Sequence, residues 1–254
     1  MKGQLTCQKG SALVEHIIAW PLLLLLTLGT LQMGMLYKAK LTLNHATFQA
    51  AREGSVNHGR GRCKGCSDSG EERMRAKLIE AMAPLYMKGA PGIVSYGKAI
   101  LNAKNSQLGE KSVDIISPDY NIFKEFKQNM YTLNCNTGSS SKCKEQQELQ
   151  IPNDNLNVRS DKLKKAGTLT LNIQDANLLK IRTNWCYSLD IPVANKILFE
   201  IVQLKFTDPN VILKKINCAA RAVAKSKLAG RTIYMIPISA TSTVQMQTPF
   251  IWKK

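Results

Sequence analysis

Histidine is scarce in this chain of 254 residues. Its three histidines, His16, His45 and His58, all precede residue 60, so the rest of the chain lacks the side chain that most often acts as a general base. Its sequence also contains no metalloprotease helix, phosphate-binding glycine loop, nucleophile elbow or dinucleotide fingerprint. We therefore expect no enzymatic activity, no cofactor and no bound metal, and we keep an enzyme with an unrecognised site as an alternative.

Acidic and aromatic residues are also few. The chain has 18 acidic against 35 basic residues, a formal net charge of +17, and 6% aromatic residues. This charge is compatible with binding to nucleic acid, anionic lipid or an acidic polymer. The basic residues are scattered, however, and few aromatic residues lie between them as a stacking surface for nucleic acid requires. The sequence therefore argues against a nucleic acid partner, and we expect no small-molecule substrate.

One long segment lacks charge altogether. From His16 to Tyr37 there are 22 consecutive residues without Asp, Glu, Lys or Arg. As a helix, at about 1.5 Å per residue, this segment covers about 33 Å, enough to cross a hydrocarbon core of about 30 Å. A secretory signal has a shorter apolar core and a small-residue cleavage motif, whereas Lys38 and Lys40 follow this run directly. We expect a retained membrane anchor, with membrane lipid as a partner.

A carboxylate, Glu15, comes directly before this run. An acidic side chain in the middle of a membrane costs about 2.5 to 3.5 kcal/mol on insertion scales, so it usually has a partner. The alternative is that Glu15 lies at the membrane interface, where the positive end of the helix dipole stabilises it. Lys2 and Lys9 favour a cytoplasmic N-terminus, but Lys38 and Lys40 weaken that signal. Charge alone therefore leaves the partner and the orientation open.

The residues around Glu15 resemble the class III signal of type IV pilins and pseudopilins. The matching segment is Gln8-Lys9-Gly10-Ser11-Ala12-Leu13-Val14-Glu15. In that family, prepilin peptidase cuts a short basic leader after a glycine, and the glutamate five residues later neutralises the N-terminal amine of a neighbouring subunit. The resemblance implies cleavage after Gly10, a mature N-terminus at Ser11 and a subunit-pairing role for Glu15.

This likeness covers about residues 9 to 54. It continues through Pro21-Leu22-Leu23-Leu24-Leu25, Leu28-Gly29, Met33-Gly34, Ala46 and Ala50-Ala51-Arg52-Glu53-Gly54. The order of these features resembles the TadE family of minor pseudopilins in tight-adherence (Flp) pilus systems. Flp-type signals often carry an aromatic residue directly after the glutamate, and in this respect His16 departs from the pattern.

The resemblance implies a noncatalytic subunit that helps pilus assembly or priming, and hence adhesion. Its partners would be prepilin peptidase and other pilin and pseudopilin subunits. Its location would be the bacterial inner membrane, as a single-pass protein with a cytoplasmic N-terminus and a periplasmic C-terminal domain. Entry of the chain into a surface pilus is left open. The competing hypothesis is a membrane-tethered periplasmic module that binds an anionic ligand and is not processed as a pilin.

The first helix is expected to extend beyond the membrane. Leu36, Ala39, Leu43, Ala46 and Ala50 recur at spacings of three and four, which is typical of one helix face. Gly54 is a plausible C-cap, and a helix over 11–53 is about 65 Å long. The alternative is a membrane helix with a short amphipathic stalk.

We divide the chain into a leader (1–10), a TadE-like transmembrane and assembly helix (11–54), a linker loop (55–70) and a periplasmic α+β domain (71–254). That domain is expected to pack an antiparallel sheet against helices.

Helices are predicted over 71–88, 120–130 and after Asp208-Pro209, the last carrying Ile212, Ile216, Ala219 and Val223 and ending before Gly230. Residues 132–165 are predicted to form an exposed loop region. Strands are predicted from Leu169 to Ile173, where the sheet begins, over Ile181 to Leu189, and from Tyr234 to Met246, with Pro237 favouring an edge position.

Six cysteines follow Cys7, and an even count in an exported domain indicates disulfides. Cys63 and Cys66 lie in a glycine-rich segment, so we favour a structural disulfide there over a redox pair or a metal site that includes His58. Cys135 and Cys143 flank a serine-rich segment that a disulfide would close. Cys186 and Cys218 would then tie a strand to the helix that follows it, a pairing that rests only on the even count.

Overall fold

The computed structural model describes residues 9–57, 70–87, 89, 92–108, 112–135, 143–159, 161–204 and 209–252. The chain divides into two compact units, each built from two stretches of sequence. Unit 1 joins Met1–Ala39 to Cys186–Pro237, and unit 2 joins Lys40–Trp185 to Ile238–Lys254. Each unit is described by itself.

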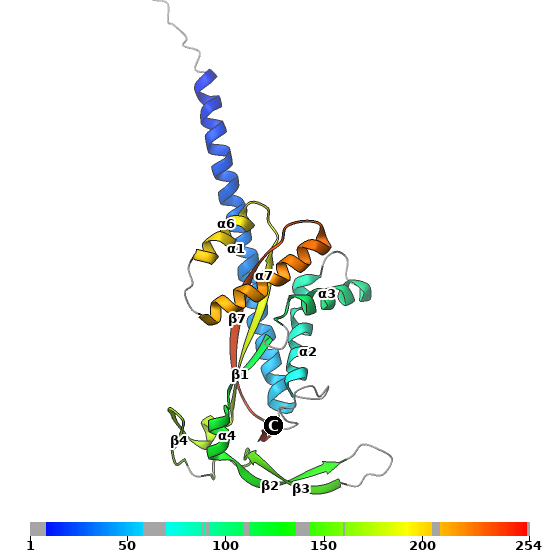
Figure 1. Cartoon of the computed structure of the whole chain (residues 1–254), viewed down its shortest axis with the longest axis vertical. Coiled ribbons are helices and arrows are strands. Elements are labelled where there is room, and N and C mark those ends of the chain that lie inside the picture. The colour runs from blue at the N-terminus through cyan, green and yellow to red at the C-terminus, as the bar shows by residue number, and fades with distance from the viewer. Residues whose placement is uncertain are drawn as a thin grey trace, which may run out of the picture. The chain divides into compact units, whose positions relative to one another are not determined.

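A long N-terminal helix precedes a mixture of helices and antiparallel strands (Figure 1), which confirms the expected α+β class. The helices are α1 (Lys9–Asn57), α2 (Gly70–Met82), the 3-10 helix η2 (Ala83–Tyr86), α3 (Ile93–Ser106), α4 (Tyr120–Phe126), α5 (Ile173–Ala176), α6 (Ala194–Leu204) and α7 (Pro209–Ala229). The strands are β1 (Val113–Ser117), β2 (Gln128–Cys135), β3 (Cys143–Ile151), β4 (Lys164–Ala166), β5 (Leu169–Leu171), β6 (Leu178–Leu189), β7 (Tyr234–Gln245) and β8 (Phe250–Ile251).

The strands form three small sheets. The first has the order β1-β6-β7, the second β2-β3-β8, and the third is the β4-β5 pair. β1 pairs antiparallel with β6, with Val113 opposite Thr183, and its register shifts between Ile115 and Ser117. β7 lies at the edge of its sheet, the position that Pro237 favours because proline cannot donate a ladder hydrogen bond.

The core of unit 2 forms around the second half of α1. Leu43, Ala46 and Ala50 of this helix are buried together with Met74 and Leu78 of α2. They recur at spacings of three and four, so the stripe read from the sequence is the buried face. The small alanine side chains let neighbouring elements approach α1 closely.

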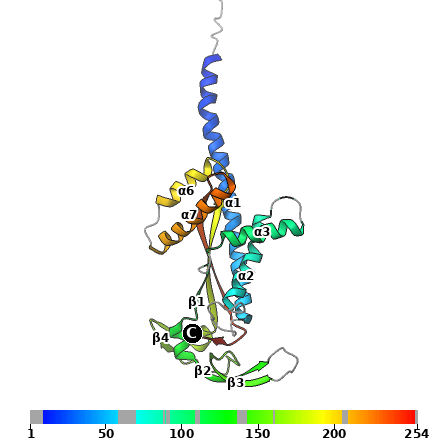
Figure 2. The same cartoon turned by 45° about the vertical axis from the view of Figure 1, so that its right-hand side comes forward.

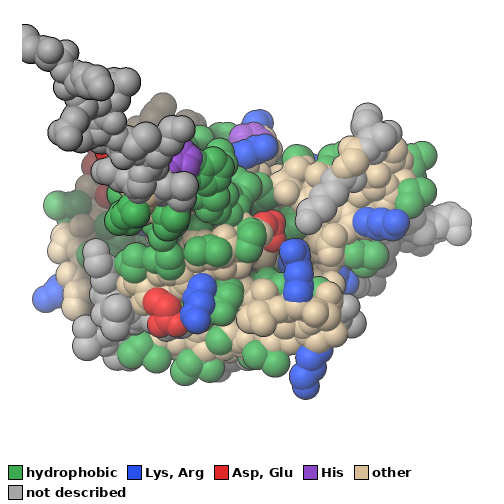
Figure 3. Space-filling model, turned by 90° about the horizontal axis from the view of Figure 1, so that it is seen from above, with side chains coloured by type: hydrophobic (Ala, Val, Ile, Leu, Met, Phe, Trp, Pro, Cys, Tyr) green, Lys and Arg blue, Asp and Glu red, His purple; other side chains and the backbone are tan. Residues whose placement is uncertain are grey.

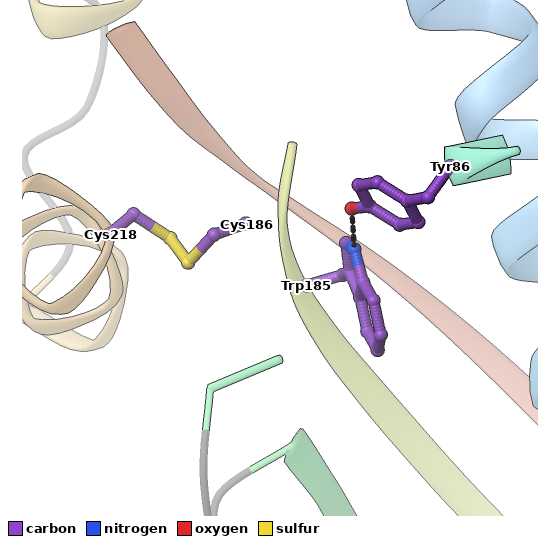
Figure 4. The surroundings of a disulfide bond; sticks show 4 residues. All are labelled: Tyr86, Trp185, Cys186 and Cys218. Atoms are coloured by element: carbon purple, nitrogen blue, oxygen red, sulfur yellow. Dashed lines mark hydrogen bonds between the residues drawn. A yellow bond between two sulfur atoms is a disulfide. The ribbon is translucent and has the colours of Figure 1, made fainter. Parts of the chain in front are cut away.

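Trp185 of β6 is the largest fully buried side chain of the described residues. Its indole Nε1 donates a hydrogen bond of 2.7 Å to the Tyr86 hydroxyl (Figure 4). This bond satisfies the polar atom of a side chain that is otherwise surrounded by apolar groups.

Within unit 1, a disulfide joins Cys186 of β6 to Cys218 of α7, with a Cα–Cα distance of 5.5 Å (Figure 4). α6 packs on the same unit, since the Phe199 ring lies 5.1 Å from that of Tyr234, centroid to centroid. Lys215 of α7 donates a 2.8 Å hydrogen bond to the carbonyl of Val202 near the end of α6. The two helices are thereby held to each other and to the strands.

Two helix predictions need correction at their ends. The helix expected over 71–88 gives way at Ala83 to the 3-10 helix η2, because Pro84 cannot donate to the helical ladder. The helix expected over 120–130 ends at Phe126, and strand β2 begins at Gln128. Helix α1 also runs past Gly54 to Asn57, so Gly54 is not its C-cap.

The loop region expected over 132–165 is wrong where strands β2, β3 and β4 occupy it, whereas residues 152–159 and 161–163 lie outside helices and strands. β2 and β3 pair antiparallel from Gln128 opposite Gln150 to Cys135 opposite Cys143. This ribbon contains few large apolar residues, so hydrophobic patterning did not reveal it. It joins the core at Ile151, a buried residue that pairs with Phe250 of β8.

The sheet also does not begin at Leu169. The sequence pattern over 169–173 forms the short strand β5 and then turns into α5 at Ile173, while β1 already begins at Val113. The turn into α5 has a local cause: the Asn172 side chain accepts a hydrogen bond from the backbone of Asp175, and Asp175 caps Asn172 in return. This capping box makes a helix start where period-two alternation predicted a strand.

Candidate functional site: the N-terminal helix

The predicted processing and pairing residues all lie at the start of α1. The backbone is helical from Lys9, so Gly10 and Ser11 lie in the first turn of the helix. The leader before Lys9 and the Ser11 side chain lie outside what the structure describes. Glu15 is exposed one turn further on, and no ion pair within the described residues involves it.

The helix segment that follows is apolar and exposed. Its exposed large apolar residues are Val14, Ile17, Ile18, Trp20, Leu22, Leu23, Leu24, Leu25, Leu26, Leu31, Met33 and Tyr37. α1 is long and apolar enough over 14–57 to cross a membrane, and 6% of its most apolar window is buried. The core helix of a soluble protein would be mostly buried, so this exposure favours a lipid environment. α1 fits a single-pass membrane anchor.

The two threonine hydroxyls inside this segment have local hydrogen-bond partners. The hydroxyls of Thr27 and Thr30 donate hydrogen bonds of 2.9 Å to the carbonyls of Leu24 and Thr27, three residues back. Pro21 lies inside the helix and removes one backbone donor, so the carbonyl of Ile17 loses its helical partner. Bilayer helices tolerate such breaks where neighbouring groups supply the missing bonds.

Gln32 is the first fully buried residue of this segment, although Met33 and Tyr37 beyond it are exposed again. Its Oε1 accepts a hydrogen bond of 2.9 Å from the backbone N–H of Ile191 in the same unit. From Val14 to Gln32 the helix rises about 27 Å, close to the thickness of a hydrocarbon core. Sequence reasoning missed Gln32, although it is the only side-chain amide in the charge-free run from His16 to Tyr37.

The glycines of α1 fall into two groups. A Cβ added at Gly29 or Gly34 would meet nothing within 4 Å, so packing inside this chain does not require either glycine. A Cβ at Gly54 would lie 2.4 Å from Met74 Sδ and 2.9 Å from Leu179 Cδ2. Gly54 is therefore needed for the close approach of α2 and β6 to α1.

The candidate disulfide cysteines are placed to different extents. Cys186 and Cys218 are bonded to each other, as expected. Cys135 and Cys143 lie opposite each other in the β2-β3 register, and their side chains lie outside the described residues. Cys63 and Cys66 also lie outside the described residues, as does His58, so that pair stays a prediction.

A cavity of about 540 Å³ in unit 2 is lined by two aspartates, Asp119 and Asp175. Both have structural partners. Asp119 accepts a 2.6 Å hydrogen bond from the backbone of Tyr120 and caps α4, and Asp175 belongs to the capping box of α5. Within the described residues, no group of three or more His, Cys, Asp or Glu side chains is arranged to hold a metal ion.

Comparison with known proteins gives one match. Residues 10–52 match the family model described as TadE-like protein, and the match begins at the glycine of the predicted cleavage site. No curated protein and no solved structure matches the chain. The matched residues form most of α1, from Gly10 at its start to Arg52 near its end. The N-terminal segment of this chain is therefore TadE-like, which supports a protein associated with a Tad pilus.

Proposed function

We propose that this chain is a noncatalytic minor pseudopilin of a tight-adherence pilus system, cut by prepilin peptidase between Gly10 and Ser11. The observation that carries the proposal is the TadE-like match, which begins at Gly10 and coincides with a continuous helix. The mature subunit would be held in the bacterial inner membrane by α1, with the rest of the chain in the periplasm.

Processing is tested by the mass of the mature N-terminus after production with the cognate prepilin peptidase. We expect a chain that begins at Ser11. Gly10→Val should block cleavage, because the added side chain fills the position that the peptidase reads as glycine. Gly29→Val is the matched control, since it alters a glycine of the same helix away from the cleavage point. Retention of Met1 to Gly10 in the parent chain would overturn the proposal.

Glu15 is proposed to pair with the N-terminal amine of a neighbouring subunit. Its side chain is exposed at the start of an apolar helix, where an unpaired carboxylate is costly. Glu15→Ala should therefore leave insertion and cleavage intact and reduce recovery of this chain with other pilin subunits. Glu15→Asp, which keeps the charge, should restore part of that recovery. Normal pilus output from Glu15→Ala would reduce Glu15 to an interfacial residue.

The competing hypothesis is a membrane-tethered module that binds an anionic ligand and keeps its N-terminus. It shares the anchor and the basic charge of the proposed pseudopilin, so neither property separates the two. Cleavage does: only the pseudopilin loses residues 1–10.

A further inference from the structure

Helix α7 exposes its apolar side. Ile212, Ile216 and Val223 lie on one face, at spacings of four and seven, and are 42%, 59% and 57% exposed. Leu213, at the side of this face, is also exposed. By contrast, Arg221 and Lys225 of the same helix are half-buried. A surface helix of a soluble domain normally shows the reverse arrangement, with its apolar stripe facing the core.

Helix α6 extends this apolar surface. Val193, Ile197 and Ile201 follow at intervals of four residues, and all three are exposed. α6 is held against α7 by the bond from Lys215 to Val202. The six residues Val193, Ile197, Ile201, Ile212, Ile216 and Val223 are called the α6–α7 face below.

The segment that carries the α6–α7 face has a basic sequence, and its exposed charged residues include Lys196 and Glu200 on α6. Residues 186–237 contain eight Lys and Arg against three Asp and Glu, a net charge of +5. Lys227 is exposed on the apolar side of α7, and Arg231 is exposed just beyond the end of that helix. Figure 3 shows a face of the molecule on which hydrophobic side chains are interspersed with Lys and Arg and also with Asp and Glu. Apolar and basic side chains together are typical of a surface that lies on anionic lipid.

The position of this surface points to the same partner. Ile191 is hydrogen-bonded to Gln32, five residues before the charge-free run of α1 ends at Tyr37, and α6 begins three residues after Ile191. α6 lies beside α1 in both views of the molecule (Figure 1, Figure 2). If α1 crosses the bilayer up to Gln32, α6 lies at the membrane interface. Tyr37, 66% exposed one turn further on, is of the type that favours this depth.

We propose that the α6–α7 face rests on the anionic phospholipid surface of the bilayer that α1 enters. The inference rests on the anchoring part of the proposed function. The apolar side chains would enter the boundary between headgroups and acyl chains, while the basic side chains would extend to phosphate groups. A second subunit is the other conceivable cover, but the excess of positive charge and the closeness to the end of the apolar run favour lipid.

The test uses the full chain in vesicles of phosphatidylcholine with phosphatidylglycerol, with bromine on the acyl chains as a quencher of tryptophan fluorescence. Ile216→Trp adds a reporter on the α6–α7 face. Lys225→Trp is the matched control, because Lys225 is half-buried and, nine residues from Ile216, lies on the opposite side of the same helix. Trp20 lies in the exposed run of α1, so quenching of the parent chain reports insertion of the anchor. Trp185 and Trp252 are common to all the chains compared.

We expect the reporter at position 216 to be quenched more strongly than the one at position 225. The double variant Lys227→Gln, Arg231→Gln should lower the equilibrium constant for docking of the α6–α7 face on the bilayer about thirtyfold. Each basic side chain near an anionic surface contributes about 1 kcal/mol to the free energy of binding. Vesicles of phosphatidylcholine alone should weaken quenching at position 216 in the same way.

Equal quenching at positions 216 and 225, with the parent chain quenched, would overturn the inference and leave the anchor standing. No quenching of the parent chain would instead contradict the anchor on which both proposals depend. A photo-crosslinker at position 216 that joins another pilus subunit, without quenching by lipid, would also overturn the inference in favour of a protein partner.

Discussion

The Oε1 atom of Gln32 accepts a hydrogen bond of 2.9 Å from the backbone N–H of Ile191, across a sequence separation of 159 residues. Gln32 is fully buried, whereas the large apolar residues before it on α1 are exposed. This bond therefore ties the later part of the apolar run to the chain that leads into α6.

Gln32→Leu tests the importance of this bond. The substitution keeps the bulk and removes the acceptor, which leaves the Ile191 N–H without its partner. We expect amide exchange at Ile191 to become about five- to tenfold faster, since a hydrogen bond is worth about 1 to 1.5 kcal/mol net. Hydrogen exchange of the full chain in detergent micelles gives the measurement. Thr30→Val, which removes a hydrogen bond within α1, is the control and should leave the exchange rate of the Ile191 amide unchanged. Equal exchange rates at Ile191 in the two variants would show that the bond from Ile191 to Gln32 is unimportant.

Gly54→Ala tests the close approach of α1 to its neighbours. The new Cβ would collide with the side chains of Met74 and Leu179, which are fully buried and cannot move away freely. We expect the free energy of unfolding of unit 2 to fall by about 1 to 3 kcal/mol, measured by urea denaturation in micelles. Gly29→Ala is the matched control, because a Cβ there meets nothing within 4 Å and alanine favours a helix. An unchanged free energy of unfolding in Gly54→Ala would show that the core repacks around the added methyl group without loss of stability.

Removal of the Cys186–Cys218 disulfide should destabilise unit 1. The bond closes a loop of 32 residues, for which the chain-entropy relation gives about 3 to 4 kcal/mol. The double variant Cys186→Ala, Cys218→Ala should therefore unfold at a lower urea concentration. The transition is monitored by chemical labelling of Tyr234 as unfolding exposes it. The two substitutions together keep either thiol from pairing elsewhere. An unchanged midpoint would mean that the unfolded chain is not restrained by this bond.

The remaining four cysteines are predicted to pair locally, Cys63 with Cys66 and Cys135 with Cys143. The β2-β3 register places Cys135 opposite Cys143, where the Cα atoms of an antiparallel pair are about 4.5 to 5.5 Å apart and within disulfide range. Peptide mapping of the oxidised chain under non-reducing conditions should recover both bonds. Cys135→Ser should free only Cys143 for alkylation. Alkylation of a different cysteine would reveal another pairing.

What could be predicted from the sequence is the part whose physics is local. An uncharged run of 22 residues forms a helix wherever it lies in lipid, because the bilayer offers its backbone no other hydrogen-bond partner. The spacing of Leu43, Ala46 and Ala50 likewise marks the buried face of α1 without knowledge of what covers it. The predicted cleavage motif and the TadE-like match lie in the same continuous segment.

The remaining features depend on residues far apart in the chain. The β2-β3 ribbon has a polar sequence and is defined by backbone pairing, which hydrophobic patterning does not detect. The stripe of Ile212, Ile216 and Val223 predicts a helix, but only the packing of α6 and α7 in unit 1 leaves that stripe exposed. Gly10 and Glu15 at the start of α1 could thus be identified as candidate functional residues from the sequence alone. The bond from Gln32 to Ile191 could not, because nothing local specifies which backbone group a buried amide meets 159 residues away.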